Sequence, residues 1–134
     1  MRVVPYAPEY LPDFLAMNRA WISEMFRMER EDERELANVE PAIQKGGQIF
    51  FALDDGGAVM ACCMITPRQD GDWEIMKFAA RGMYTGTGAG SACLKACIDY
   101  AKKRGLPSLQ KFICFPTEKL DHDHRLMTHM VIRR

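Results

Sequence analysis

Three glycines at alternate positions, placed directly before a helix, are the feature of this sequence that most clearly indicates chemistry. Gly86, Gly88 and Gly90 lie between a strand-like segment (73–80) and an amphipathic segment (91–104). Glycine lets the backbone approach a ligand with no side chain in the way. The first amides of a helix have no intrahelical partner and carry the positive end of its dipole, so they bind phosphate oxygens. The order strand, glycine loop, helix therefore predicts a phosphate-binding loop.

Other glycine-rich loops fit this stretch less well. A dinucleotide-binding loop has the pattern G-x-G-x-x-G near the first strand, whereas here the third glycine comes one residue early and the loop lies two-thirds along the chain. A P-loop needs Gly-Lys followed by Ser or Thr, which this stretch lacks. The remaining alternative is an ordinary connection between a strand and a helix.

Composition narrows the class of protein. The 134 residues fit one domain, and a hydrophobic content of 48% with 27% charged residues is ordinary for a soluble globular protein. Lys plus Arg and Asp plus Glu are both 18, so the net charge is zero and no basic excess favours nucleic-acid binding. No signal peptide and no membrane-spanning run is recognisable. We therefore expect neither a nucleic-acid nor a membrane partner.

The five cysteines indicate reduced thiols. Their number is odd and Cys62 and Cys63 are adjacent, which favours a cytoplasmic protein over one with a disulfide framework. Cys93 and Cys97 have the i, i+4 spacing of a ligand pair, but no second pair accompanies them. We therefore interpret them as buried structural thiols and expect no metal site; a metal-binding role for the Asp-His-Asp-His run at 121–124 is the weaker alternative.

Hydrophobic periodicity predicts the elements that position the loop. In chain order they are a strand at 2–6, a helix from Pro8 to about Met25, a polar helix at 28–44, a meander of strands at 48–53, 58–66 and 73–80, the helix at 91–104 and a strand at 109–115. The order β-α-α-β-β-β-α-β predicts an α/β fold with a mixed, mostly antiparallel central sheet flanked by helices. We expect the last strand to run parallel to the strand at 73–80, with the sheet splayed where Phe78 meets Phe112.

With these elements in place, the sequence resembles the GCN5-related N-acetyltransferase (GNAT) family, in particular its small bacterial members. The resemblance is carried by Glu74-Ile75-Met76-Lys77-Phe78-Ala79-Ala80, by Gly86-Thr87-Gly88-Ala89-Gly90 and by the helix that ends Tyr100-Ala101-Lys102-Lys103-Arg104-Gly105. Residues 21–35 and 46–52 are similar to the acceptor-side helices and second strand of such proteins. The resemblance covers roughly residues 2–110 of a single acyl-CoA N-acyltransferase-like domain (1–134) and leaves 111–134 as an atypical tail.

The resemblance implies an enzyme that transfers an acetyl group from acetyl-CoA to a primary amine of a small molecule or peptide by direct attack. It implies that the backbone of Phe78, Ala79 and Ala80 pairs with the pantetheine arm, and that the N–H at Phe78 stabilises the oxyanion. It also implies that the pyrophosphate is held by the backbone of Thr85, Gly86, Thr87, Gly88, Ala89, Gly90 and Ser91.

Glu74 is the nearest candidate for the general base. An ammonium acceptor must lose a proton, and Glu74 would accept it through a water molecule; the alternative is a solvated strand residue. Regular alternation puts one set of side chains on the face of Glu74 and the other set on the opposite face. The first set is Glu74, Met76 and Phe78, and the second is Trp73, Ile75 and Lys77. The acidic run at 29–35 indicates an exposed helix face; the alternative is a surface that attracts a cationic amine.

Two positions depart from the family pattern. The family usually has Arg or Gln before the first glycine, where this chain has Thr85. The tyrosine that commonly protonates the leaving thiolate is replaced by Met127, with Tyr84 and Tyr100 as candidate substitutes. The alternative function is therefore a catalytically impaired or non-catalytic acyl-CoA-binding relative.

The tail itself suggests a hypothesis about its origin. Read one nucleotide earlier, the codons for 112–117 and 127–131 are compatible with the family's serine-asparagine and with its tyrosine and glycine. We hypothesise that roughly the last twenty residues derive from a shifted reading frame. The last helix and strand would then be disrupted, and the apolar surface left exposed would favour a homodimer.

Overall fold

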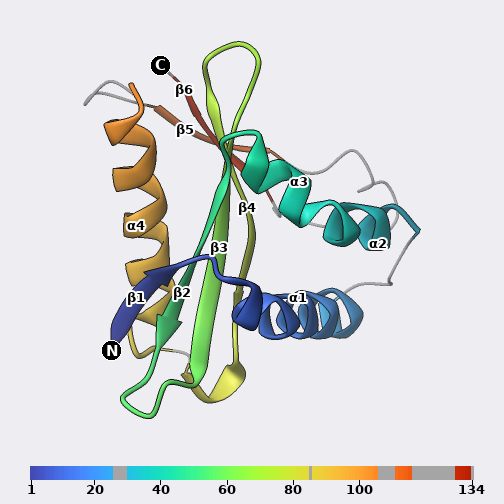
Figure 1. Ribbon diagram of the computed structural model, residues 1–134, viewed down its shortest axis with the longest axis vertical. Coiled ribbons are helices and arrows are strands. Elements are labelled where there is room, and N and C mark those ends of the chain that lie inside the picture. Colours follow the sequence, from blue (N-terminus) through green and yellow to red (C-terminus); the bar gives the residue numbers. More distant parts are fainter. Residues whose placement is uncertain (26–29, 85, 106–110, 116–128, 134) are drawn as a thin grey trace.

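A six-stranded sheet forms the centre of the computed structural model (Figure 1), in the strand order β1-β2-β3-β4-β6-β5. The structure describes residues 1–25, 30–84, 86–105, 111–115 and 129–133. The strands are β1 (Arg2–Pro5), β2 (Gln48–Leu53), β3 (Val59–Pro67), β4 (Trp73–Ala80), β5 (Lys111–Phe115) and β6 (His129–Arg133). Every neighbouring pair is antiparallel.

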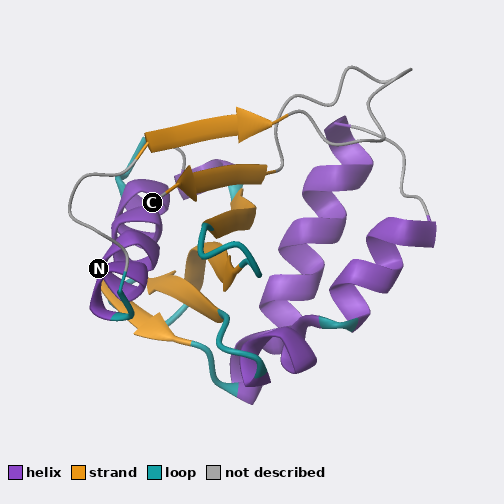
Figure 2. Cartoon of the chain, turned by 90° about the horizontal axis from the view of Figure 1, so that it is seen from above, coloured by secondary structure: helices purple, strands orange, loops and turns teal. Residues whose placement is uncertain are grey.

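Helices cover both faces of this sheet, as Figures 1 and 2 show. They are η1 (Pro8–Tyr10), α1 (Leu11–Met25), α2 (Arg30–Ala37), α3 (Val39–Gln44), η2 (Gly82–Tyr84) and α4 (Ala89–Lys103). Helix α4 lies on one face, and α1, α2 and α3 lie on the other (Figure 1). The sheet is thus the middle layer of three, which gives it two buried faces.

Each face of the sheet has its own hydrophobic core. On the α4 face, Cys93 and Cys97 pack with Trp73 and Ile75 of β4. On the opposite face, Phe14 of α1 packs with strand and α2–α3 residues, including Phe51, Ile49 and Leu36. Strand β3 is buried along most of its length because it contributes side chains to both cores. The sheet is therefore well fixed at β3 and β4.

The predicted α/β fold and its antiparallel meander are confirmed, with three differences in detail. The predicted helix at 28–44 is divided into α2 and α3, and the chain then turns at Gly46 with φ +108°. Strand β6 adds a sixth strand within the tail. We predicted that the sheet splays where Phe78 of β4 meets Phe112 of β5. This prediction is wrong, because these two strands are not neighbours: β6 lies between them and pairs with both.

The burial of the cysteines agrees with the prediction of structural thiols. Cys62, Cys63, Cys93 and Cys97 are free and fully buried. The side chain of Cys114 and the segment 116–128, with the histidines at 122 and 124, lie outside the described residues. Within the described part of the chain no group of three or more metal-ligating side chains gathers. No helix in that part is both long and apolar enough to cross a membrane.

Candidate active site

Strand β4 contains a β-bulge at its centre. Met64 of β3 pairs with Met76, but Cys62 pairs with Ala79, so two β4 residues, Lys77 and Phe78, lie opposite Cys63 alone. Lys77 has φ +53°, and it is the one non-glycine residue with positive φ in the described part of the chain. A left-handed conformation costs a non-glycine residue about 1–2 kcal/mol, and such residues concentrate at functional sites. The bulge therefore marks the centre of β4 as a candidate site.

The bulge reverses the alternation of side chains along β4. Before it, Trp73 and Ile75 belong to the core beneath α4; after it, Ala79 belongs to the core on the opposite face. Lys77 lines a cavity on the α2–α3 side together with Glu74, whereas the Phe78 ring lies against α4. The predicted faces are thus wrong for Lys77 and Phe78, because one extra residue in a strand moves every following side chain to the other face.

One edge of β4 loses its partner strand at the bulge. Strand β6 pairs with Trp73 through Met76 only. Beyond Met76, none of the described strands pairs with β4 on that edge. The backbone of Lys77 through Ala80, including the predicted pantetheine-binding residues Phe78, Ala79 and Ala80, follows the bulge along this edge. An extended ligand can add to such an edge as a further strand does.

The glycine loop connects β4 to α4 as predicted. Gly86 and Gly88 have φ +84° and +88°, a left-handed conformation that favours glycine, and the space where a Cβ would lie is empty at both. Gly88 is the N-cap of α4 and no side chain caps the helix there. The Thr87 hydroxyl accepts a hydrogen bond from the Ala89 N–H at 3.4 Å. Thr85 lies outside the described residues.

Gly90 lies in contact with the bulge. A Cβ added to Gly90 would be 2.9 Å from Cζ of Phe78, closer than real Cβ contacts come. The Phe78 ring, 40% exposed, thus lies over the first turn of α4. Of the other predicted loop residues, Ala89 is buried beneath this turn and Ser91 is exposed on it. The bulge and the glycine loop are therefore neighbours in space.

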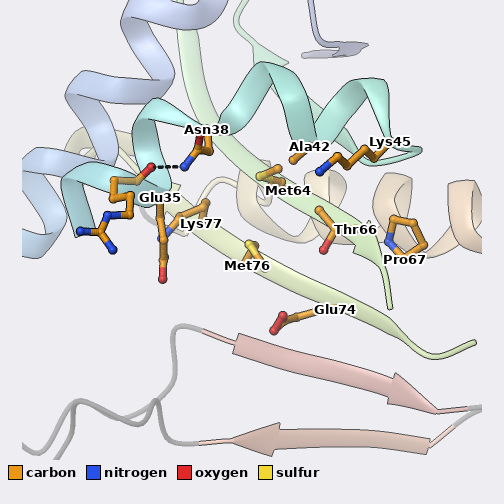
Figure 3. Close-up of a pocket in the computed structure, with 11 residues that line it drawn as sticks. Glu35, Asn38, Ala42, Lys45, Met64, Thr66, Pro67, Glu74, Met76 and Lys77 are labelled. Atoms are coloured by element: carbon orange, nitrogen blue, oxygen red, sulfur yellow. Dashed lines mark hydrogen bonds and ion pairs between the residues drawn. The ribbon is translucent and has the colours of Figure 1, made fainter. Parts of the chain in front are cut away.

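A cavity of about 510 Å³ opens on the opposite face, between α2–α3 and strands β3 and β4 (Figure 3). Its volume lies within the range of small-molecule sites. Met64 and Met76 give it an apolar floor. Charged and polar side chains surround this floor. The lining residues are Arg34, Glu35, Asn38, Ala42, Lys45, Met64, Thr66, Pro67, Glu74, Met76 and Lys77.

Two carboxylates enter this cavity from different elements. The Glu74 side chain is 17% exposed, and its Oε1 lies 3.9 Å from Nη1 of Arg68. Glu35 of α2 pairs through Oε2 with Nζ of Lys77 at 2.5 Å. Figure 3 shows Glu35 and Lys77 at one end of the cavity and Glu74 at the other, with Met76 between them. Glu74 thus lines the cavity, and its role as a base stays a prediction.

Glu35 and Lys77 also line the cavity; Lys77 was not predicted to do so, and Glu35 was considered only as part of the acidic run at 29–35. The acidic run at 29–35 indicated an exposed face, and nothing in the sequence connects Glu35 with a residue 42 positions later. The available signal was the amphipathic pattern of α2, whose Leu36 is buried. With Leu36 buried against the sheet, the adjacent Glu35 reaches Lys77 of β4.

Tyr100, one candidate substitute for the missing tyrosine, has another place in the structure. Its hydroxyl donates a hydrogen bond to the Gly46 carbonyl at 2.9 Å. Its ring packs edge-on against Phe50 and Trp73, and the Arg104 guanidinium lies 3.6 Å from the ring centroid. Tyr100 therefore joins α4 to the start of β2 and does not line the cavity. The side chain of Tyr84 and Met127 lie outside what the structure describes.

Comparison with known proteins decides the family. The family described as "Acetyltransferase (GNAT) family" matches residues 15–121. The chain belongs to the GNAT acetyltransferase family. No curated protein matches the sequence significantly.

The likeness to solved GNAT structures extends over nearly the whole length of the chain. A GNAT-family acetyltransferase from Staphylococcus aureus Mu50 is 13% identical and has a TM-score of 0.76, with 98% of this chain and 97% of that chain covered. A GCN5-related N-acetyltransferase from Kribbella flavida is 18% identical with a TM-score of 0.69, and 97% and 95% are covered. Rv2747 from Mycobacterium tuberculosis, solved in complex with CoA, is 17% identical with a TM-score of 0.66, and 90% and 67% are covered. At these identities the likeness concerns the fold.

Proposed function

We propose that this GNAT protein transfers an acetyl group from acetyl-CoA to a primary amine by direct attack. The observation that carries the proposal is the position of the β4 bulge. It lies where the strand edge loses its β6 partner, next to the glycine loop on one face and to the cavity on the other. A cofactor bound along the edge and an amine bound in the cavity would meet there.

The described residues fit the phosphates and the arm of acetyl-CoA. Gly86 and Gly88 leave open space, and the N-cap residue Gly88 has no side chain, so the amides of Gly90 and Ser91 in the first turn of α4 would be directed at a ligand on the loop. We assign the pyrophosphate to Thr85, Gly86, Thr87, Gly88, Ala89, Gly90 and Ser91. We assign the pantetheine amides to the backbone of Phe78, Ala79 and Ala80.

The chemistry follows from this placement. The amine nitrogen attacks the thioester carbonyl carbon, and the negative charge that develops on the carbonyl oxygen is stabilised by the N–H of Phe78 at the bulge. When the intermediate collapses, the C–S bond breaks and CoA leaves as a thiolate; the attacking nitrogen gives up one proton to become the amide, and the thiolate takes up one proton to become the thiol. No described cysteine is available as a covalent nucleophile, since all four are fully buried. This supports direct attack.

The acceptor amine is assigned to the cavity, with Glu74 as its base. The Glu74 carboxylate would remove a proton from the ammonium acceptor through a water molecule. The cavity is large enough for a small molecule or the end of a peptide. The four buried free thiols fit a reducing compartment, and we propose a cytoplasmic location.

The test compares two glycine variants at opposite ends of α4. Gly88→Glu places a bulky carboxylate on the loop, whereas Gly105→Glu makes the same change at a residue with φ +105° and equally open space beyond the other end of the helix. Both changes place an L residue at a positive φ in open space, but only Gly88→Glu should repel the pyrophosphate. Calorimetry should show acetyl-CoA binding weakened by at least about tenfold in Gly88→Glu alone.

A set of amines is then screened with acetyl-CoA, and release of the CoA thiol is the quantity measured. Wild-type protein that is folded but does not bind acetyl-CoA would overturn the proposal. Binding without transfer to any amine in the screen would point to the non-catalytic alternative.

A further inference from the structure

We propose that Lys77 and Glu35 are positioning residues, whose ion pair sets the β4 bulge so that the Phe78 N–H is directed at the thioester carbonyl. The proposal rests on the proposed function, since it assigns a task to the same bulge. Neither residue is given a role in proton transfer. Helix α2, on the side of the acceptor cavity, would thus control the direction of the Phe78 N–H that stabilises the oxyanion.

The side chain of Lys77 holds the bulge from one side. It is 7% exposed, and Nζ lies 2.5 Å from Oε2 of Glu35 on α2. A buried ammonium without a partner is costly, so this carboxylate fixes where the lysine side chain lies. Because Lys77 has φ +53°, its backbone would otherwise relax toward ordinary extended geometry. The ion pair therefore opposes relaxation of the residue that directly precedes Phe78.

The main chain of Lys77 is held from within the core. The Cys62 thiol donates to the Lys77 carbonyl at 3.8 Å, and the Asn18 amide nitrogen donates to the same sulfur at 3.8 Å. Asn18 is buried on α1, and its amide nitrogen also donates to the Phe14 carbonyl at 2.9 Å. The carbonyl of Lys77 belongs to the same peptide unit as the N–H of Phe78. Fixing that carbonyl thus fixes the direction of the N–H.

The two contacts act on one peptide unit from two helices. Asn18 of helix α1 holds the Lys77 carbonyl by way of the Cys62 thiol. Glu35 of helix α2 holds the Lys77 side chain. A misdirected N–H would still allow acetyl-CoA to bind, because the glycine loop and the backbone of Ala79 and Ala80 do not depend on the direction of the Phe78 N–H. It would lose interaction with the carbonyl oxygen, and most of that loss would appear in the transition state. The expected signature is therefore a fall in kcat with an unchanged affinity for CoA.

The experiment uses acetyl-CoA labelled with ¹³C at the carbonyl, so that no acceptor is needed. In the wild type, a hydrogen bond from Phe78 N–H should move the carbonyl resonance of the bound ligand away from its position in water. Lys77→Met and Glu35→Gln should bring it back toward that of a carbonyl without this bond. Lys77→Arg should keep it, since Arg can pair with Glu35. Lys95→Met removes an exposed lysine from α4 and is the matched control.

Turnover of the best amine from the screen provides the second measurement. Lys77→Met should lower kcat by about tenfold to a hundredfold, with the Kd of CoA unchanged. Lys77→Gly relieves the left-handed strain while removing the ion pair, and it should show the same loss if the pair acts by positioning. Lys77→Gly also replaces Lys77→Met in both measurements if Lys77→Met does not fold.

The outcomes separate the two proposals. A wild type that does not bind acetyl-CoA would overturn the proposed function. Normal wild-type binding and turnover, together with a Lys77→Gly variant whose carbonyl resonance and kcat match the wild type, would overturn the positioning role alone. A variant with equal losses in CoA affinity and in kcat would also overturn it, because that result would indicate a general structural role.

Discussion

The ring of Phe78 occupies the space that a side chain at Gly90 would need. Its Cζ lies 2.9 Å from the position of a Gly90 Cβ, and Cε1 lies at 3.1 Å. Phe78 thus belongs to two parts of the site: its backbone forms the bulge, and its side chain lies on the first turn of α4. Glycine at 90 is required here for close approach, a different reason from the left-handed backbone at Gly88.

Gly90→Ala should therefore disturb both cofactor binding and the bulge. The added methyl must push the Phe78 ring aside; because Phe78 is 40% exposed, we expect a cost at the low end of the about 1–3 kcal/mol typical of overpacked cores. We expect weaker acetyl-CoA binding and a lower melting temperature. The double variant Gly90→Ala with Phe78→Leu should recover most of the stability, because the shorter side chain vacates the space. Additive losses in the double variant, measured by calorimetry and thermal unfolding, would contradict this account.

The elements of the fold could be predicted because their signals are local. The strand at 73–80 has the bounds of β4, and the glycine pattern at 86–90 gave the loop its place before a helix. The order of strands in the sheet was harder. The pairing of β4 with β6 joins Trp73 with Ile132, and no local pattern in the sequence encodes that contact.

The bulge shows why part of the site was missed. Alternation assumes a regular strand, and a lysine at φ +53° cannot be recognised from its neighbours. Once Lys77 is assigned to the wrong face, its contact with Glu35 is missed as well. The predicted face of Glu74 and Met76 agrees with the structure, because both precede the bulge, where alternation still holds.

Glu74→Gln should lower turnover in a way that depends on pH. If Glu74 deprotonates the acceptor, the variant should lose about a hundredfold in kcat/KM near neutral pH. The loss should shrink at high pH, where the amine is already neutral. Asp70→Asn is the matched control, because Asp70 is another carboxylate beside Arg68, at 3.7 Å, and does not line the cavity. A loss that is independent of pH would argue against a role as base.

The buried thiols should react only when the protein unfolds. Burial raises the pKa of Cys62, and it raises that of Cys93 from 9.0 to about 12, with a further contribution from Cys97. Unfolded thiols ionise near pH 9 while the folded ones stay protonated, so stability should fall as pH rises above about 9. Iodoacetamide at pH 9, followed by peptide mass spectrometry, should label the 62–63 and 93–97 peptides slowly in native protein and rapidly in denaturant. Rapid native labelling of these peptides would show that the core is more open than described.

Tyr6 should make a separate contribution to stability at high pH. Its hydroxyl donates to Oε1 of Glu40 at 2.5 Å, which connects the chain after β1 to α3. Burial, the hydrogen bond and the negative charge of Glu40 raise its pKa from 10.0 to about 12. Between these values the unfolded phenol loses its proton while the folded one keeps it, so the free energy of unfolding should decrease as pH rises from about 10 to 12.

The measurement is a series of urea unfolding curves from pH 9 to 11.5. Tyr6→Phe should show a shallower decrease than the wild type, because it has no phenol at this position to titrate. Tyr10→Phe leaves the Tyr6–Glu40 hydrogen bond in place and should keep the wild-type slope. Ultraviolet difference titration of wild type against Tyr6→Phe should yield one phenol with a midpoint near 12. A midpoint near 10 would mean that Glu40 does not hold the Tyr6 proton, and that this contact contributes nothing to the joining of β1 and α3.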